Sequence, residues 1–255
     1  MRLLRSALFN VLFYMLVVVL MVAALPALMR GGDAIEWHAR RWARLSLALL
    51  DRICGLKVEF LGLENVPPGP AILAVKHQSA LDVLALILAV EHFSFIYKRE
   101  LDYLPLFGSY LRSCGQISID RSKRAAVLGQ IVAAAKTKFS EGRRLVIFPE
   151  GTRRPVGAPP LYKSGVARIA EASGVACIPV ALNSGLFWPR RRFIRRPGTM
   201  VVEFLLPIAP DADKAQFMTL LQSRIETATD RLVADAVSKD ASLLPPSTVA
   251  APSRG

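Results

Sequence analysis

Cysteine is scarce in this chain, and histidine is equally scarce. The three cysteines are Cys54, Cys114 and Cys177, and no two of them are close in sequence. An odd number of widely spaced cysteines excludes a disulfide framework and the usual spacing of a metal site. This usage is typical of a protein from a reducing compartment. With only three histidines in 255 residues, the candidates for a general base are few.

Acidic residues are also few: 20 Asp and Glu stand against 33 Lys and Arg, which gives a net charge of +13. A basic protein attracts anionic partners. The sequence lacks a helix-turn-helix, zinc-finger spacing and the aromatic signature of RNA-binding domains, so we expect no nucleic-acid partner. The charge therefore favours an anionic lipid surface, with a basic surface that serves only solubility as the alternative.

The N-terminal region is strongly apolar. No charged residue occurs from Ala7 to Met29, and a membrane-spanning helix needs about 20 residues. A secretory signal peptide is the alternative, but its apolar region usually has about 7–15 residues and precedes a small-residue cleavage site. We therefore predict a retained membrane segment.

The next stretch, from Ile35 to Ile53, mixes tryptophan and leucine with arginine. This mixture suits a membrane interface, where the stretch would lie on the surface or form a shallow hairpin with the first helix. A core helix of the following domain is the alternative. Because basic residues flank the first segment on both sides, the positive-inside rule gives no orientation, and a hairpin with both ends in the cytoplasm would explain this symmetry.

Short strand patterns and helix patterns alternate in the rest of the chain. The expected strands are Lys57–Leu61, Ala71–Val75, Phe93–Tyr97, Ile117–Ile119, Leu145–Phe148, Ile178–Leu182 and Met200–Leu205, and the expected helices are Ala80–Val90, Lys123–Phe139, Gly165–Ala172 and Asp213–Val237. Such alternation predicts an α/β fold with a mixed, largely parallel sheet flanked by helices. We expect a membrane-anchoring segment at 1–54, a catalytic domain at 55–238 and a disordered Ser/Pro/Ala-rich tail at 239–255.

Polar residues follow the apolar strand Ala71–Val75 directly, at the end of a strand where α/β sheets place their chemistry. The turn that opens the next helix contains His77 and Asp82. If the chain folds the carboxylate back onto the imidazole, the carboxylate fixes the tautomer and leaves Nε2 free to take a proton from a hydroxyl. The alternative is a structural histidine, with Asp82 simply favouring the helix N-terminus.

A second polar block, Phe148-Pro-Glu-Gly-Thr-Arg153, follows the strand Leu145–Phe148. Arg153 can bind a phosphate bidentately, and Glu150 can accept hydrogen bonds from hydroxyls. An ordinary turn with a surface ion pair is the alternative.

Together, these blocks resemble the glycerolipid acyltransferase family, especially its bacterial 1-acylglycerol-3-phosphate acyltransferases. The His77-x4-Asp82 block comes first and the Phe148–Arg153 block third; Gly115–Arg121 with Tyr97–Leu101 resembles the second family block, and Val175–Val180 the fourth. The resemblance covers the chain from about Val58 to Leu205. Lys76 stands where many members have asparagine.

The resemblance implies roles for individual residues. His77 would be the general base and Asp82 its orienting partner. Arg121, Arg153 and Lys98 would bind the acceptor phosphate, while Glu150, Gly151 and Thr152 would belong to the acceptor-binding block, with Glu150 and Gly151 holding the glycerol portion. Pro179 would shape the acyl-chain region or simply pack in the core.

The implied reaction acylates the free hydroxyl of 1-acylglycerol-3-phosphate (lysophosphatidic acid) to give phosphatidic acid. The donor would be acyl-CoA or an acyl-carrier protein, and no covalent acyl-enzyme is required because a thioester is already activated. Neither a metal nor another cofactor is expected, because the phosphate is a handle and not the reacting group. We expect the catalytic domain on the cytoplasmic face of a bacterial inner membrane. The alternatives are another lyso-lipid acceptor, such as lyso-ornithine lipid, and a non-catalytic lipid-binding protein.

The densest basic run is Pro189–Pro197, which contains five arginines beside Trp188 and Phe193. It suits anionic lipid headgroups, at about 1 kcal/mol for each basic residue near the surface. An acidic acyl-carrier protein fits the same charge equally well, and a solvated run without a partner is the third alternative.

Overall fold

The computed structural model of the chain describes residues 1–120 and 127–243. Within these residues, seven strands form one sheet in the order β1-β7-β6-β2-β5-β3-β4. The strands are β1 (Leu56–Leu61), β2 (Ile72–Val75), β3 (Phe93–Lys98), β4 (Ile117–Ile119), β5 (Arg144–Ile147), β6 (Cys177–Leu182) and β7 (Gly198–Phe204). Neighbouring strands are parallel except for β6 and β7, which pair antiparallel. The predicted mixed, largely parallel sheet is therefore confirmed.

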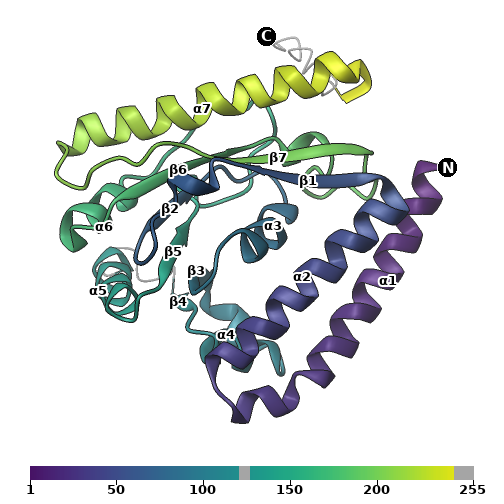
Figure 1. Ribbon diagram of the computed structural model, residues 1–255, viewed down its shortest axis with the longest axis horizontal. Helices are drawn as coiled ribbons and strands as arrows, with labels where there is room; N and C mark the ends of the chain where they lie inside the picture. Colours follow the sequence, from purple (N-terminus) through teal and green to yellow (C-terminus); the bar gives the residue numbers. More distant parts are fainter. Residues whose placement is uncertain (121–126, 244–255) are drawn as a thin grey trace, which may run out of the picture.

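Helices cover both faces of this sheet (Figure 1). The α-helices are α1 (Arg2–Ala23), α2 (Gly32–Cys54), α3 (Leu81–Ala89), α4 (Phe107–Ser113), α5 (Val127–Ser140), α6 (Gly165–Ser173) and α7 (Lys214–Lys239). Short 3₁₀ helices are η1 (Leu25–Met29), η2 (Leu63–Asn65), η3 (Arg99–Tyr103), η4 (Ser184–Leu186) and η5 (Ala241–Leu243). One core layer joins the sheet to α1, α2 and α3, and a second joins it to α5, α6 and α7.

The central strand β2 contributes to both layers because its side chains alternate between the two faces. Leu73 and Val75 pack in the layer of α3, whereas Ile72 and Ala74 pack in the layer of α5, α6 and α7. All four side chains are fully buried. A parallel strand that is buried on both faces has a continuous run of apolar residues. For this reason β2 could be predicted from the sequence.

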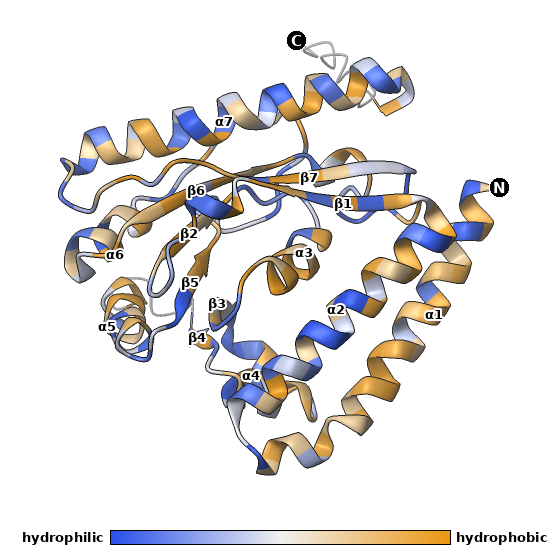
Figure 2. Ribbon diagram, viewed as in Figure 1, coloured by the Kyte–Doolittle hydropathy of each residue, from blue (hydrophilic) through white to orange (hydrophobic). Residues whose placement is uncertain are grey.

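The first two helices form the hairpin that was expected from the sequence. Figure 2 shows α1 as predominantly apolar and α2 as mixed. The inner side of α1 includes Phe9, which is fully buried and packs edge-on against Trp188, 5.6 Å between ring centroids. The outer side of α1 carries an exposed apolar stripe formed by Leu4, Leu8, Val11, Met15, Val18 and Val22. Within the described residues, α1 is the one helix long and apolar enough to cross a membrane.

Helix α2 lies between α1 and the α/β domain, so it is both the second arm of the hairpin and a core helix. Ala43 and Leu50 are fully buried in the same cluster as α3. The Arg40 guanidinium donates to the carbonyl oxygens of Ile87 and Val90, at 2.9 and 2.7 Å. These are carbonyls that the last turn of α3 leaves unpaired, so one of the arginines expected at a lipid interface instead caps a helix.

The helix predicted over Lys123–Phe139 is observed as α5 from Val127, and its first four predicted residues lie outside the described part of the chain. The described structure extends into the tail that was predicted to begin at residue 239. Helix α7 ends at Lys239, and Leu243, in η5, is buried against the larger core cluster. The Arg196 guanidinium donates to the Leu243 carbonyl at 3.2 Å.

Candidate active site

The turn between β2 and α3 is organised by one buried carboxylate. Asp82 lies in the first turn of α3 and is fully buried. Its Oδ2 accepts from the backbone N–H groups of Gln78 and Ser79, at 2.8 and 2.9 Å. The Ser79 hydroxyl in turn accepts from the Leu81 N–H at 3.2 Å. The Leu81 N–H is one of the donors that a helix N-terminus leaves unpaired, and the hydrogen bonds from Gln78 and Ser79 fix the path of the preceding turn.

The turn brings Asp82 back to His77, with 2.9 Å between Asp82 Oδ2 and His77 Nδ1. The Ser184 hydroxyl donates to the other carboxylate oxygen, Oδ1. With the carboxylate held by backbone N–H groups and a hydroxyl, the proton belongs on Nδ1 and the Nε2 lone pair remains available as a base. The His77 side chain is 15% exposed, so it is held firmly but is not sealed from solvent.

The second polar block lies beside this turn because β5 is the parallel neighbour of β2. The Phe148 ring stacks on the His77 imidazole, 3.8 Å between centroids and 20° between planes. The backbone N–H of Arg154 donates to the His77 carbonyl at 2.8 Å. The two blocks that were found separately in the sequence thus form one site at the carboxyl ends of adjacent strands.

Glu150 has contacts different from those expected. It was expected to hold the glycerol portion of an acceptor, yet its side chain has no exposed surface. Oε1 lies 3.1 Å from the Lys76 ammonium, and Oε2 accepts from the His77 backbone N–H at 3.3 Å. Glu150 therefore holds the His77 turn from inside the protein, and its side chain offers no exposed surface to an acceptor.

Two of the three expected phosphate ligands, Lys98 at the end of β3 and Arg153 in the loop after β5, lie at the carboxyl edge of the sheet. Arg153 is half-buried directly after the β5 block, and its carbonyl accepts from the Arg190 guanidinium at 3.1 Å. Lys98 is exposed at the end of β3, the next strand after β5. Thr152 is exposed. Arg121 lies outside the described residues.

Gly151 makes the sharp turn of this block. Its φ is +66°, and a Cβ at this position would lie 2.9 Å from the Lys163 Nζ atom. A side chain at positive φ is strained, so this glycine shapes the backbone whether or not it also contacts a ligand.

The predicted basic run is divided in two by the structure. Arg190, Arg191 and Arg192 are exposed, whereas Arg195 is buried. The Arg195 guanidinium lies 4.2 Å from the centroid of the Trp188 ring, and its backbone N–H donates to the Ser6 hydroxyl of α1 at 2.9 Å. Desolvation by burial lowers the pKa of Arg195 from its usual value. Only part of the run is thus available for an anionic partner.

Comparisons with known proteins identify the family of this chain. Residues 57–183 match the family profile described as Acyltransferase. A 1-acyl-sn-glycerol-3-phosphate acyltransferase from Pseudomonas aeruginosa is 32% identical over 196 residues, which cover 77% of this chain and 76% of that protein. The chain belongs to the acyltransferase family.

Two further relatives extend the comparison of this acyltransferase. The 1-acyl-sn-glycerol-3-phosphate acyltransferase alpha from Ovis aries is 28% identical over 209 residues, covering 81% of this chain and 72% of the relative. The crystal structure of the 1-acyl-sn-glycerophosphate (LPA) acyltransferase from Thermotoga maritima superposes with a TM-score of 0.76, at 23% identity, over 91% of this chain and 98% of that chain. The predicted family and fold are therefore confirmed.

The acyltransferase site also contains residues that sequence reasoning missed. Ser184 lies two residues after the buried strand β6 and donates to Asp82. A polar residue at the carboxyl end of a central strand could have been recognised by the rule that identified His77. Glu226 lies on α7, far from any motif, and pairs with Lys76; no sequence signal indicates that contact.

Proposed function

We propose that this acyltransferase transfers a fatty acyl group from an acyl thioester to the free hydroxyl of 1-acylglycerol-3-phosphate, giving phosphatidic acid. The observation that carries the proposal is the His77–Asp82 pair, in which Nδ1 is engaged and Nε2 is left available. The names of the relatives from Pseudomonas aeruginosa and Ovis aries favour this acceptor.

In the proposed reaction, His77 Nε2 removes the proton of the acceptor hydroxyl as its oxygen attacks the thioester carbonyl. The tetrahedral intermediate collapses, the C–S bond breaks, and the imidazolium returns the proton to the departing thiolate. The Asp82 carboxylate stabilises the imidazolium during the interval. No covalent acyl-enzyme is required, because a thioester carbonyl is activated enough for direct attack by the deprotonating hydroxyl.

The acceptor phosphate would serve as a handle and not as the reacting group. Lys98 is the last residue of β3, and Arg153 lies in the loop that follows β5, the strand between β3 and β2. Arg121 was assigned to the same role from the sequence. Guanidinium groups suit this role because their planar forks match phosphate oxygens. Binding the phosphate at this edge would bring the acceptor hydroxyl toward the imidazole.

We further propose that α1 lies along one leaflet and does not span the bilayer. Helix α2 runs beside α1 along its length (Figure 1), and α2 carries Asp33, Glu36, Arg40, Arg41 and Arg44 while packing on α3. A spanning α1 would draw these charged groups into hydrocarbon, at about 2.5–3.5 kcal/mol each for a central Asp, Lys or Arg. With α1 in the surface plane, its apolar stripe enters the lipid, and the site stays near the headgroups on the proposed cytoplasmic face.

The deciding experiment is an acceptor panel with purified full-length protein in mixed micelles. The panel contains 1-acylglycerol-3-phosphate and lyso-ornithine lipid, each tested with acyl-CoA and with acyl-carrier protein as donor. We expect acylation of 1-acylglycerol-3-phosphate to form phosphatidic acid. Robust acylation of the phosphate-free acceptor alone would overturn the proposed acceptor, and the absence of acylation with every pair would overturn the enzyme assignment.

A further inference from the structure

The residue before the catalytic histidine points away from it. Side chains in β2 alternate between the two core layers, and residues 76 and 77 continue this alternation beyond the strand. His77 stacks on Phe148 in the layer of α3, whereas Lys76 reaches toward α7 in the opposite layer. Two consecutive residues thus connect the two faces of the sheet.

Lys76 is the centre of a buried ionic cluster. Its ammonium lies 3.1 Å from Glu150 Oε1 and 2.7 and 3.0 Å from the two carboxylate oxygens of Glu226. The side chains of Lys76, Glu150 and Glu226 are 3%, 0% and 21% exposed. A buried charge requires a partner, and removing one member of a buried pair is strongly unfavourable. Lys76 therefore supplies the charged partner that the buried Glu150 carboxylate requires, and the contact holds that carboxylate in place.

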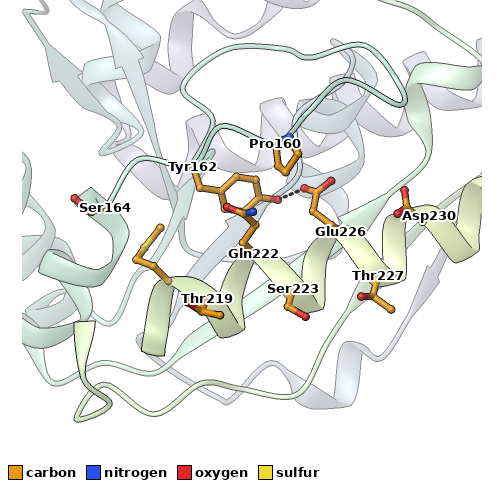
Figure 3. Close-up of a pocket in the computed structure, with 10 residues that line it drawn as sticks. Pro160, Tyr162, Ser164, Thr219, Gln222, Ser223, Glu226, Thr227 and Asp230 are labelled. Atoms are coloured by element: carbon orange, nitrogen blue, oxygen red, sulfur yellow. Dashed lines mark hydrogen bonds between the residues drawn. The ribbon is translucent and has the colours of Figure 1, made fainter. Parts of the chain in front are cut away.

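Tyr162 closes the outer side of this cluster. Its hydroxyl donates to Glu226 Oε1 at 2.7 Å, as Figure 3 shows where both residues line an open groove beside α7. The Lys76 ammonium lies 5.8 Å from the centroid of the Tyr162 ring. Burial and the neighbouring Glu226 carboxylate raise the pKa of Tyr162 far above its usual value, so the phenol stays neutral and remains a donor.

The cluster is connected to the active site through the second oxygen of Glu150. This oxygen accepts from the backbone N–H of His77, the residue whose imidazole faces Asp82. A continuous series of contacts therefore runs from α7 through Glu226, Lys76 and Glu150 to the catalytic turn. Helix α7 is a firm support for this series, because Phe217, Leu221 and Ile225 are buried against the sheet.

We propose that Lys76 and Glu226 are positioning residues, which hold Glu150 against the His77 backbone and so set the direction of the imidazole. Neither residue touches the reacting atoms. The inference rests on the proposed function, because it assigns these residues to the general-base step. It explains why Lys76 can replace the asparagine of many family members: the lysine serves the buried face of the sheet and not the substrate.

The test compares three variants of the full-length protein in the acylation assay. Glu226→Ala removes the outer partner of Lys76 but leaves the Lys76–Glu150 pair, so the fold is retained. Glu226→Gln keeps a carbonyl oxygen that can accept from Lys76. Asp230→Ala is the matched control, because Asp230 is an exposed acidic residue one turn further along α7 and lines the same groove.

We expect Glu226→Ala to lower kcat roughly tenfold, within the 10²-fold that a small misplacement of a catalytic group can cost. KM for donor and acceptor should keep the wild-type values, Glu226→Gln should recover most of the activity, and Asp230→Ala should match wild type. Hydrogen exchange of the peptide that contains residues 74–82 should accelerate in Glu226→Ala. An unchanged kcat per folded molecule in that variant would overturn the proposal.

Lys76→Met provides a second route to the same answer. It should lower kcat more than Glu226→Ala, because Glu150 loses its only cation in the cluster; adding Glu150→Gln to Lys76→Met should restore the thermal stability by removing the uncompensated charge. A folded Lys76→Met variant with wild-type kcat would contradict the proposal. Failure of the proposed function is distinguishable, because the wild-type protein itself would then fail to acylate 1-acylglycerol-3-phosphate.

Discussion

Ser184 donates its hydroxyl hydrogen to Oδ1 of Asp82, the carboxylate whose other oxygen faces the imidazole of His77. The serine begins η4, just after β6, and the aspartate comes from the first turn of α3. This contact fixes the carboxylate from a third strand end, so the orientation of His77 depends on β2, β5 and β6 together.

Replacing Ser184 with alanine should both destabilise the protein and lower kcat. The buried carboxylate would lose one of its donors, and a hydrogen bond to a charged group contributes about 1.5–3 kcal/mol. The measurements are denaturant unfolding and steady-state kinetics, with Ser238→Ala as the control because Ser238 is exposed near the end of α7. An unfolding free energy equal to that of wild type would show that the hydroxyl contributes nothing to holding Asp82.

The change His77→Ala should lower turnover by at least the roughly 10²-fold typical of losing a general base. The fold should persist, because the imidazole is partly exposed and Asp82 keeps its backbone donors. His92→Asn is a suitable control: His92 is exposed with a φ of +50°, which asparagine tolerates. Wild-type turnover in a folded His77→Ala protein would exclude His77 as the base.

The change Arg153→Ala should raise KM for the phosphate-bearing acceptor roughly tenfold or more, because charge-assisted hydrogen bonds contribute about 1.5–3 kcal/mol. KM for the acyl donor should change little. Arg192→Ala controls for the general loss of a positive charge, since Arg192 is exposed in the neighbouring basic run. Equal increases in the two KM values would argue against a phosphate-binding role.

Stability should depend on pH through Asp102, which holds η3 beside the end of β3. Hydrogen bonds from Tyr97 and then Ser118 lower the pKa of Asp102 below its usual value. The stabilisation is therefore present above about pH 4, the usual carboxyl pKa, and is lost as the pH falls through the lower folded-state pKa. The free-energy gap between wild type and Asp102→Asn should close in acid, whereas Asp211→Asn, at an exposed site, should show no such change.

The hydrogen bond between Tyr97 and Asp102 should also make stability depend on pH in alkaline solution. Burial, together with the hydrogen bond to Asp102, raises the pKa of Tyr97 to about 12 from 10.0. Since the unfolded chain loses this proton first, the stabilisation is present below pH 10 and is lost as the pH rises toward 12. A Tyr97→Phe variant should lack this alkaline decline, and a decline of unchanged size would assign it to another group.

Spin labels can establish how α1 lies in the bilayer. Labels on single cysteines at Leu4, Met15 and Val22 should all report a similar shallow depth if the helix lies along one leaflet. A spanning helix would place Met15 deepest and the other two near opposite surfaces. The three native cysteines should react poorly with the labelling reagent, because burial raises the pKa values of their thiols. As a control, a label on a cysteine introduced at the exposed Glu171 of α6 should remain in water.

The strands nearest the site could be predicted because each is a short apolar run followed at once by polar residues. β2 precedes His77 and β5 precedes Glu150, and both strands lie in the middle of the sheet. In contrast, α4 was not predicted. It has only seven residues and includes Gly108, and it is held by tertiary contacts such as the hydrogen bond from the Tyr110 hydroxyl to the Met21 carbonyl, 2.6 Å.

The contacts of Lys76 and Arg195 were beyond sequence reasoning for a different reason. Each side chain is long and charged, and composition places such residues in solvent or against a ligand. Glu226 is 150 positions from Lys76, and Arg195 is covered by aromatic rings from α1 and from the loop after β6. These partners meet only in the folded protein, so the local sequence pattern could not predict the contacts.

The packing of Phe9 and Ser6 against the Trp188 loop limits how the protein can be shortened. The Trp188 carbonyl accepts a hydrogen bond from the Ser79 hydroxyl at 2.7 Å. The loop that α1 covers therefore also supports the turn that carries His77. Removing the hairpin would expose Arg195 and the Trp188 indole to solvent, because Phe9 and Ser6 of α1 contact this loop. The shortened chain would therefore lose part of its hydrophobic core together with its apolar N-terminal helix.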